Sequence, residues 1–184
     1  MRVITGTARG TKLFSIQGNK TRPTSQRIKE AQFSVIQFLV EGSVVLDLFA
    51  GTGQLGIEAL SRGAIEAVFV DNDDDAIKVI RNNLKKTYFT NKAKVVKSDV
   101  FRYISNLRRE FDIVFVDAPY GIKHTSRVVQ MIGSHIAENG IVLCETELNA
   151  FMPEETEDLK LSKQYRYSQS MIWYYRKYID TEES

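Results

Sequence analysis

The sequence predicts an α/β fold in which a seven-stranded, mostly parallel sheet carries helices on both faces. Five apolar strand-like segments between residues 44 and 144 alternate with helical segments, and two further strand-like segments follow near the end with no helix between them. Such alternation is typical of parallel sheets covered on both sides. With 184 residues, 43% of them hydrophobic, we expect a single domain over residues 1–184.

The start of the chain predicts a small appendage followed by a helix. Residues 1–22 contain two short extended pieces joined by a stretch with glycine at both ends, so we expect a hairpin-like arm, with the helix and core over residues 23–184. Thr24, directly after Pro23, is the expected N-cap of the helix, and Gly42 is expected to end it. Apolar residues at helical spacing predict its buried face: Ile28, Ala31, Val35 and Leu39.

The remaining elements follow from the hydrophobic pattern. The expected strands cover residues 44–49, 67–71, 94–96, 111–117, 140–144, 160–165 and 171–175. The expected helices cover residues 54–61, a stretch after Asp73–Asp75, about 100–107 and about 126–137. The last two strands are consecutive, so they are expected to form an antiparallel hairpin at one edge of the sheet.

Positive charge is concentrated at the start of the chain. Residues 1–40 hold seven basic residues and one acid, although the net charge of the whole chain is only +2. Clustered positive charge indicates a polyanionic partner such as a nucleic acid, or else a solvated basic surface.

Composition argues against several other classes of function. No apolar run approaches the roughly 18 residues of a membrane span, so we expect no membrane partner. Cys144 is the single cysteine and there are two histidines, so we expect no metal site. The first residues lack the apolar stretch of a secretion signal, and we expect a cytoplasmic protein that acts as a monomer.

A glycine-rich loop lies where the first strand is expected to pass into a helix. Gly51, Gly53 and Gly56 match the G-x-G-x-x-G pattern in this strand-to-helix context. Asp71 follows Gly51 by twenty residues, at the end of the second strand, where a carboxylate can accept hydrogen bonds from ribose hydroxyls. Together they predict a site for a nucleotide-like cofactor.

Two further acids bear on which cofactor this is, since dinucleotide and S-adenosylmethionine sites share this geometry. Asp47 ends the first strand, where it could reach the ammonium of an amino-acid moiety but would repel a pyrophosphate, which favours S-adenosylmethionine. Asp99 follows the third strand and could bind an adenine amino group, act as a helix N-cap, or do both.

The tetrapeptide Asp117-Ala118-Pro119-Tyr120 follows the fourth strand. It resembles the (Asp/Asn)-Pro-Pro-(Tyr/Phe) motif of S-adenosylmethionine-dependent amino-methyltransferases. The lone pair of a base amine is delocalised into the ring, and a carboxylate and a carbonyl that accept its N–H groups would direct it toward the methyl donor. An aromatic ring can stack on the base and hold it in line.

Longer segments resemble one family, the bacterial 16S ribosomal RNA guanine-N2 methyltransferases often called RsmD. They are the arm around Arg9-Gly10, the segment Arg22-Pro23-Thr24-x-x-Arg27, and the stretch from Asp47 to Ala64. The resemblance implies a Rossmann-like methyltransferase fold and a guanine in 16S rRNA as the target, within the small ribosomal subunit or an assembly intermediate. Ala118 departs from the family, which usually has proline there, but its backbone carbonyl is still available.

The candidate residues fall into three groups. The expected catalytic residues are Asp117, Ala118, Pro119 and Tyr120. The expected S-adenosylmethionine-binding residues are Asp47, Phe49, Ala50, Gly51, Thr52, Gly53, Asp71, Asn72, Asp99 and Val100. The residues expected to bind RNA are Arg2, Arg9, Lys12, Arg22, Thr24 and Arg27.

Three alternatives stay open. A DNA adenine- or cytosine-amino methyltransferase would use the same tetrapeptide, although 184 residues leave little room for a target-recognition domain. An NAD-dependent oxidoreductase would bind NADH and not S-adenosylhomocysteine. A non-catalytic RNA-binding module would bind RNA without S-adenosylhomocysteine.

Overall fold

A computed structural model describes residues 1–16, 26–119, 124–167 and 169–178, with residues 26, 27 and 124 described by their backbone alone. The strands are β1 (Val44–Leu48), β2 (Glu66–Asp71), β3 (Ala93–Lys97), β4 (Phe111–Val116), β5 (Ile136–Glu147), β6 (Leu159–Tyr167) and β7 (Ser170–Lys177). The α-helices are α1 (Gln26–Ile36), α2 (Gln54–Ser61), α3 (Asp74–Lys86), α4 (Val100–Ser105) and α5 (His124–Ile132). Two short 3₁₀ turns cover Thr90–Lys92 and Gly133–His135.

The seven strands form one sheet in the order β3-β2-β1-β4-β5-β7-β6. Strands β1 to β5 pair in parallel, and β7 and β6 add in antiparallel orientation. Both the seven-stranded sheet and the antiparallel hairpin predicted from the sequence are confirmed. The strand order reverses between β1 and β4, and open α/β sheets bind ligands at the carboxyl ends of the strands at such a switch point.

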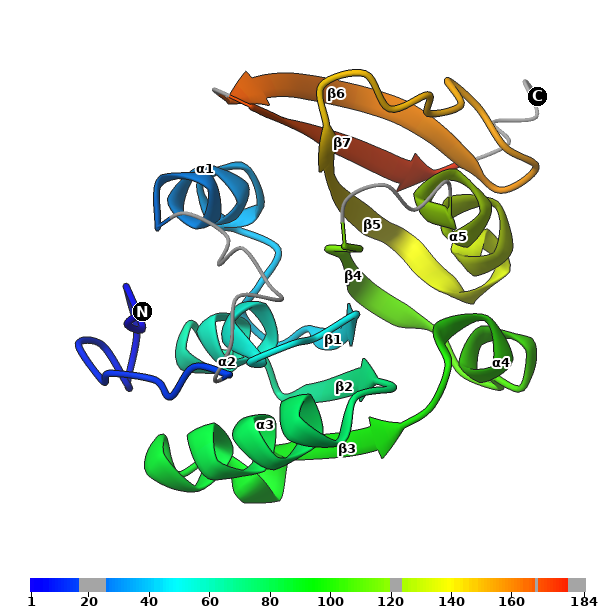
Figure 1. Cartoon of the computed structure of the whole chain (residues 1–184). Helices are drawn as coiled ribbons and strands as arrows, with labels where there is room; N and C mark the ends of the chain where they lie inside the picture. Colours follow the sequence, from blue (N-terminus) through cyan, green and yellow to red (C-terminus); the bar gives the residue numbers. More distant parts are fainter. Residues whose placement is uncertain (17–25, 120–123, 168, 179–184) are drawn as a thin grey trace.

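Apolar side chains cover both faces of the sheet. On one face, α1, α2 and α3 pack over alternate strand residues such as Val45, Phe69 and Phe115. On the other face, α4 and α5 pack over the intervening residues, which include Val68 and Val114. Figure 1 shows the sheet running from β3 at the bottom to β6 at the top, between these two groups of helices. Burial on both faces explains why the central strands are nearly continuous apolar runs.

The structure corrects the expected boundary between the last helix and the fifth strand. The predicted helix over residues 126–137 ends at Ile132, and β5 already begins at Ile136 and runs through twelve residues to Glu147. The first part of β5 pairs with β4 through Ile136 and Phe111, and the register then shifts before Ile141. An irregularity of this kind leaves polar residues inside the strand, which hides its start from a pattern search.

The predicted buried face of the first helix is wrong for two of its four residues. Val35 is 36% exposed and Leu39 is 38% exposed, and α1 ends at Ile36, before the expected end at Gly42. The face toward the core instead includes two polar side chains, and its buried residues are Ile28, Lys29, Gln32, Phe33 and Ile36. The expected N-cap, Thr24, lies outside the described residues.

The first 13 residues form the predicted hairpin-like pairing. Arg2 and Lys12 make an isolated antiparallel bridge, and the Val3 and Leu13 amides donate to the carbonyls of Thr11 and Met1. Val3 and Leu13 are buried in the core on the α2 side of the sheet. The arm is therefore packed onto the body of the protein through two apolar side chains.

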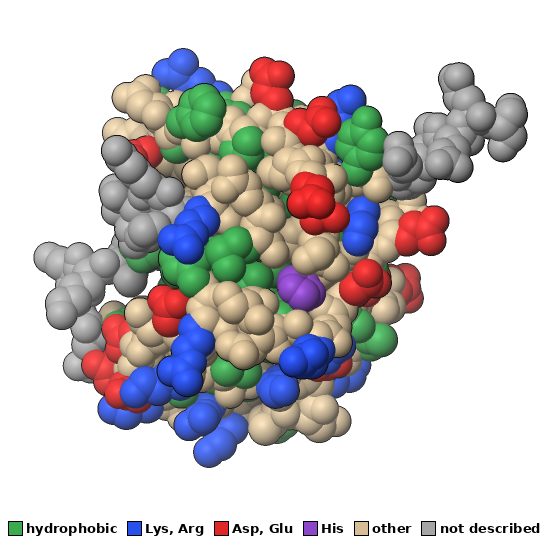
Figure 2. Space-filling view, turned by 90° about the vertical axis from the view of Figure 1, so that its right-hand side faces the viewer, with side chains coloured by type: hydrophobic (Ala, Val, Ile, Leu, Met, Phe, Trp, Pro, Cys, Tyr) green, Lys and Arg blue, Asp and Glu red, His purple; other side chains and the backbone are tan. Residues whose placement is uncertain are grey.

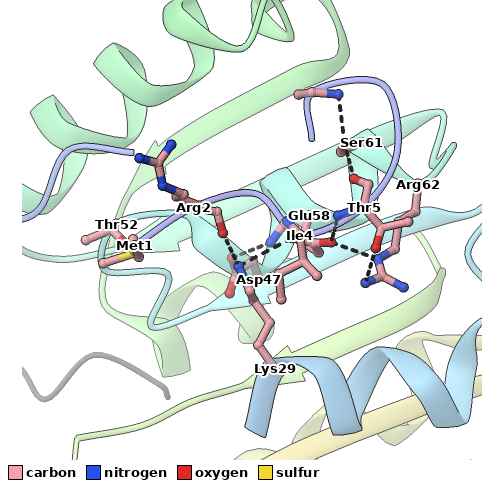
Figure 3. A network of polar contacts seen from close by, with 12 residues as sticks. Met1, Arg2, Ile4, Thr5, Lys29, Asp47, Thr52, Glu58, Ser61 and Arg62 are labelled. Carbon is pink, nitrogen blue, oxygen red and sulfur yellow. Dashed lines mark hydrogen bonds and ion pairs between the residues drawn. The ribbon is translucent and has the colours of Figure 1, made fainter. Parts of the chain in front are cut away.

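A buried carboxylate fixes this arm to α2 (Figure 3). Glu58 is fully buried and accepts hydrogen bonds from the backbone amides of Ile4 and Thr5, at 2.8 and 3.0 Å. It also forms ion pairs with Lys29 Nζ at 3.3 Å and with Arg62 Nε at 2.9 Å. Glu58 thus joins the arm, α1 and α2 through one side chain.

Candidate functional site

The glycine loop turns tightly between β1 and α2. Gly51 and Gly53 have φ angles of 54° and 75°, and Phe49 has a φ of 58°, which is uncommon for a residue with a side chain. Ala50 donates its amide to Val70, and Gly53 donates its amide to Ala50. A Cβ at Gly51 would meet only the Phe49 carbonyl, at 3.9 Å, so the loop backbone is open to a ligand there.

Asp71 at the end of β2 is tied to this loop. Its Oδ2 accepts the Gly51 amide at 2.8 Å and its Oδ1 accepts the Asp73 amide at 2.9 Å. Asp73 in turn caps α3 by accepting the Asp75 amide. The sequence placed Asp71 next to the loop, and the structure brings the two together through a direct hydrogen bond. Asn72, beside it, is exposed.

Asp47 lies beneath the loop and is almost completely buried, with 1% exposure. Its Oδ2 accepts the Gly56 amide at 3.0 Å, in the first turn of α2. Gly53, the N-cap of α2, has no side chain to fill this role, so Asp47 supplies the missing acceptor from the neighbouring strand. The sequence analysis did not predict this capping role of Asp47. A glycine at the expected N-cap position, with an acid near the end of the preceding strand, could have indicated it.

Three acids lie together at the switch point. Burial raises the pKa of Asp47 well above its ordinary value, and the nearby negative charges of Asp117 and Asp71 raise it further. Asp47 lies near the end of β1, Asp71 ends β2 and Asp117 follows β4, and these strands are neighbours in the sheet. The carboxyl edge of the sheet therefore gathers three carboxyl groups, an arrangement that favours a cationic ligand over an anionic one.

Asp99 caps α4, as one of the two predicted interpretations expected. Its Oδ1 accepts the Arg102 amide at 3.0 Å. Val100, the first residue of the helix, is buried. Asp99 itself is exposed, so the cap leaves its carboxylate accessible beside the end of β3.

The tetrapeptide directly follows β4. Asp117 is half-buried, Ala118 is buried at 7% exposure, and Pro119 is exposed. Tyr120 lies outside the described residues. Since β4 pairs with β1 from Val45–Ile113 to Leu48–Val116, the segment begins beside the glycine loop.

A contact that sequence reasoning missed joins the arm to the glycine loop. The side chain of Asn83, fully buried in α3, accepts the Phe14 amide at 2.7 Å and donates to the Phe14 carbonyl at 3.2 Å. It also donates to the Thr52 carbonyl at 2.9 Å. The Thr52 hydroxyl contacts the sulfur of Met1 at 3.4 Å. A buried asparagine on an otherwise apolar helix face was the available sign.

The residues expected to bind RNA are only partly described. Arg2, Arg9 and Lys12 are exposed on the arm. Arg2 donates from Nη1 to the Gly10 carbonyl at 2.8 Å. Arg22 and Thr24 lie outside the described residues, and Arg27 is placed in α1 by its backbone alone.

Within the described ranges, no group of three or more His, Cys, Asp or Glu side chains could hold a metal ion. Nor does any helix in those ranges combine the length and apolar character needed to cross a bilayer. Cys144 is buried in the core, and burial raises the pKa of its thiol.

The family described as "Conserved hypothetical protein 95" matches residues 1–176. The chain belongs to this family. The predicted likeness to RsmD is confirmed. "Putative rRNA methyltransferase YlbH" of Bacillus subtilis is 36% identical over 182 residues, which cover 96% of this chain and 99% of that protein. "Ribosomal RNA small subunit methyltransferase D" of Haemophilus influenzae is 32% identical and covers 80% of this chain and 79% of its own length.

A solved structure of similar fold supports the same assignment. "Putative methyltransferase yhhF from Escherichia coli" superposes with a TM-score of 0.84 at 27% identity, and the match covers 96% of this chain and 97% of that one. The seven-stranded sheet with its antiparallel hairpin is thus the fold of S-adenosylmethionine-dependent methyltransferases.

Proposed function

We propose that this protein transfers a methyl group from S-adenosylmethionine to the exocyclic N2 amine of a guanine in 16S ribosomal RNA. The observation that carries the proposal is the group of three carboxylates around the glycine loop, Asp47, Asp71 and Asp117. Family membership over residues 1–176 supports the reaction class. The names of the relatives support ribosomal RNA of the small subunit as the substrate.

The described residues fit this methyl donor. The backbone at Gly51 is open, Asp71 ends β2, and Asp99 follows β3. Here Asp71 would bind the ribose and Asp99 the adenine amine, while Asp47 would face the ammonium group. A dinucleotide would bring its pyrophosphate against Asp47, which is unfavourable. The acidic edge therefore favours S-adenosylmethionine over NAD.

The residues after β4 would act on the base. When bound, S-adenosylmethionine supplies a methyl group activated by its positively charged sulfur. Asp117 would accept an N–H of the guanine amine and take up the proton that the amine loses as its new C–N bond forms. The Ala118 carbonyl would accept the second N–H, and Tyr120 would stack on a guanine flipped out of its helix.

The arm would hold the RNA around this guanine. Arg2, Arg9 and Lys12 are exposed, and the buried Glu58 and Asn83 fix the backbone that carries them. A fixed arm loses little conformational freedom on binding, which favours affinity. The contact with RNA would be extended by Arg22, Thr24 and Arg27. We further propose that the protein acts as a monomer.

The test is transfer of labelled methyl groups into small ribosomal subunits that lack the modification, followed by identification of the methylated nucleoside. We expect N2-methylguanosine from the wild type. The variant Asp117→Ala should lose about 100-fold or more in turnover, because it loses the proton acceptor, and should still bind S-adenosylhomocysteine. Glu138→Ala, which removes an exposed acid of β5, is the matched control.

Three results would redirect the proposal. Full activity of Asp117→Ala would refute the catalytic role of this residue. Methylation of duplex DNA in place of ribosomal subunits would identify a DNA amino-methyltransferase. Calorimetry that detects NADH binding and no S-adenosylhomocysteine binding would indicate an oxidoreductase.

A further inference from the structure

A basic hollow lies on the face of the sheet opposite the arm. It has a volume of about 350 Å³ and is formed by β3, α4 and the turn that leads to β4. Its lining contains no carboxylate and four cationic side chains, which are Lys94, Arg102, Arg108 and Arg109. Ser98, Tyr103, Asn106 and Leu107 complete it. Figure 2 shows Lys and Arg side chains gathered over the lower half of this face.

One of these cations is neutralised and held in place. Arg109 donates from Nη1 and Nη2 to the two oxygens of Glu66, at 2.8 and 3.0 Å, and its guanidinium lies 5.1 Å from the centre of the Phe111 ring. A two-pronged pair of this kind has a fixed geometry. Arg109 therefore forms a rigid wall of the hollow rather than a free binding group.

The other three cations are available. Lys94, Arg102 and Arg108 are exposed, and none of them forms an ion pair with any residue that the structure describes. The surrounding sequence is also basic, since residues 92–109 hold six Lys and Arg residues against one acid, Asp99. This second basic segment is hidden in the total charge because acids elsewhere in the chain offset it.

The position of the hollow relates it to the proposed catalytic edge. Ser98 and Arg102 lie beside the carboxyl end of β3, whereas Arg108 and Arg109 precede β4 at its amino end, so the hollow extends along α4 from the carboxyl edge of the sheet toward the opposite edge. The arm packs with α2 and α3 on one face of the sheet, whereas α4 covers the other face. A nucleic acid strand that crosses the carboxyl edge can therefore contact the arm on one side and, on the other, the end of the hollow that Ser98 and Arg102 form, from which the hollow continues toward Arg108.

We propose that this hollow binds backbone phosphates of the ribosomal RNA substrate, as a second contact on the far side of the target guanine from the arm. The proposal rests on the function proposed above. Lys94, Arg102 and Arg108 would pair with phosphates, and Tyr103 and Asn106 would offer hydrogen bonds to phosphate or sugar oxygens. The lack of any acid in the lining suits a polyanion.

The test neutralises the three available cations in one variant, K94Q/R102Q/R108Q. Fluorescence anisotropy measures binding of a 16S rRNA transcript at several salt concentrations, and calorimetry measures S-adenosylhomocysteine binding. We expect at least about tenfold weaker RNA binding near 0.1 M salt and a salt slope smaller by about 2–3, because each phosphate contact releases counterions. S-adenosylhomocysteine binding should not change.

The matched control is K160Q/K163Q/R166Q, which removes the same charge from exposed positions on β6, at the opposite edge of the sheet. Wild-type RNA affinity and salt slope in the hollow variant, or an equal loss in the control, would overturn the proposal. So would weaker binding to assembled subunits with normal binding to naked RNA, which would assign the hollow to an acidic ribosomal protein. Absence of methyl transfer by the wild type would refute the proposed function separately.

Discussion

Removal of the Glu58 carboxylate is expected to destabilise the fold strongly. Glu58 is fully buried and serves two backbone amides of the arm and two cations. The variant Glu58→Ala would leave the amides of Ile4 and Thr5 without this acceptor. It would also leave Lys29, which is only 2% exposed, without its counter-charge.

The size of the effect follows from these contacts. Breaking a buried ion pair by removing one partner costs about 3–5 kcal/mol. Total stability is typically about 5–15 kcal/mol, so the loss is a large part of it. For a protein of this size, each kcal/mol lowers Tm by about 2–4 °C, which predicts a fall of about 6–20 °C.

A second substitution separates the lost charge pair from lost packing. Lys29→Met in the Glu58→Ala background removes the stranded ammonium, so it should restore part of the stability that the first change lost. Unfolding in urea, followed by circular dichroism, gives the free energies of unfolding of the wild type, Glu58→Ala, Lys29→Met and the double variant, which together form the cycle. A loss below about 1 kcal/mol in Glu58→Ala, or no recovery in the double variant, would refute the reasoning.

The same site predicts a pH dependence. Burial lowers the pKa of Lys29, and the charge of Glu58 raises it in part. Without Glu58 the folded-state pKa of Lys29 falls further below its unfolded value, so the folded state favours the neutral amine. The stability of Glu58→Ala should then rise, relative to the wild type, as pH increases from that lowered pKa toward the ordinary pKa of lysine. Parallel stability curves would contradict this.

Three further predictions concern the glycine loop. Burial raises the pKa of Asp47, so ionisation of this carboxyl group destabilises the folded protein as pH rises through the raised pKa. Asp47→Asn should therefore raise Tm at neutral pH and weaken S-adenosylmethionine binding in calorimetry. An unchanged Tm would contradict this prediction. Asn83→Leu removes three hydrogen bonds and should cost about 2–4 kcal/mol, with faster hydrogen exchange at the Phe14 amide than in the wild type. A Cβ at Gly56 would clash with the Phe69 ring, so Gly56→Ala should cost about 1–3 kcal/mol in urea unfolding, and Phe69→Leu should relieve part of this loss.

The strands and the antiparallel edge hairpin could be predicted because their burial and spacing are written in the sequence. Residues 111–116 are apolar at five of six positions and form β4 at the centre of the sheet. The last two strands have no room for a crossover helix between them, so only an antiparallel pairing was possible. Both features, the apolar central strand and the short connection, depend on residue type and spacing, so they can be read directly from the sequence.

The buried face of α1 could not be predicted, because polar side chains occupy it. Lys29 and Gln32 read as surface residues, yet both are buried, while Phe38, just beyond the helix, is 90% exposed. Lys29 is buried because Glu58, nearly thirty residues later, supplies its counter-charge. A pairing between distant residues has no periodic pattern, so only the folded structure reveals it.

The glycine loop shows the same limit at the candidate site. The spacing of Gly51 and Asp71 correctly placed an acid beside the loop, but not the hydrogen bond by which that acid orients it. Asp47 was expected to face a ligand, and its burial with the Gly56 amide adds a structural role as the cap of α2. Sequence patterns therefore identified which residues lie near the glycine loop. They did not show which backbone amide donates to each carboxylate, because that depends on the path of the folded backbone.

The charges of the protein are arranged in a way that separates its two proposed ligands. Acids occupy the carboxyl edge of the sheet around Asp47, and exposed cations lie on the arm and in the hollow beside α4, on opposite faces. The proposed site would attract a cationic methyl donor to the edge and repel an RNA phosphate from it. We expect phosphates to bind at these flanks, so that a strand in contact with both can cross the edge and turn a base inward without bringing its own phosphate against the acids.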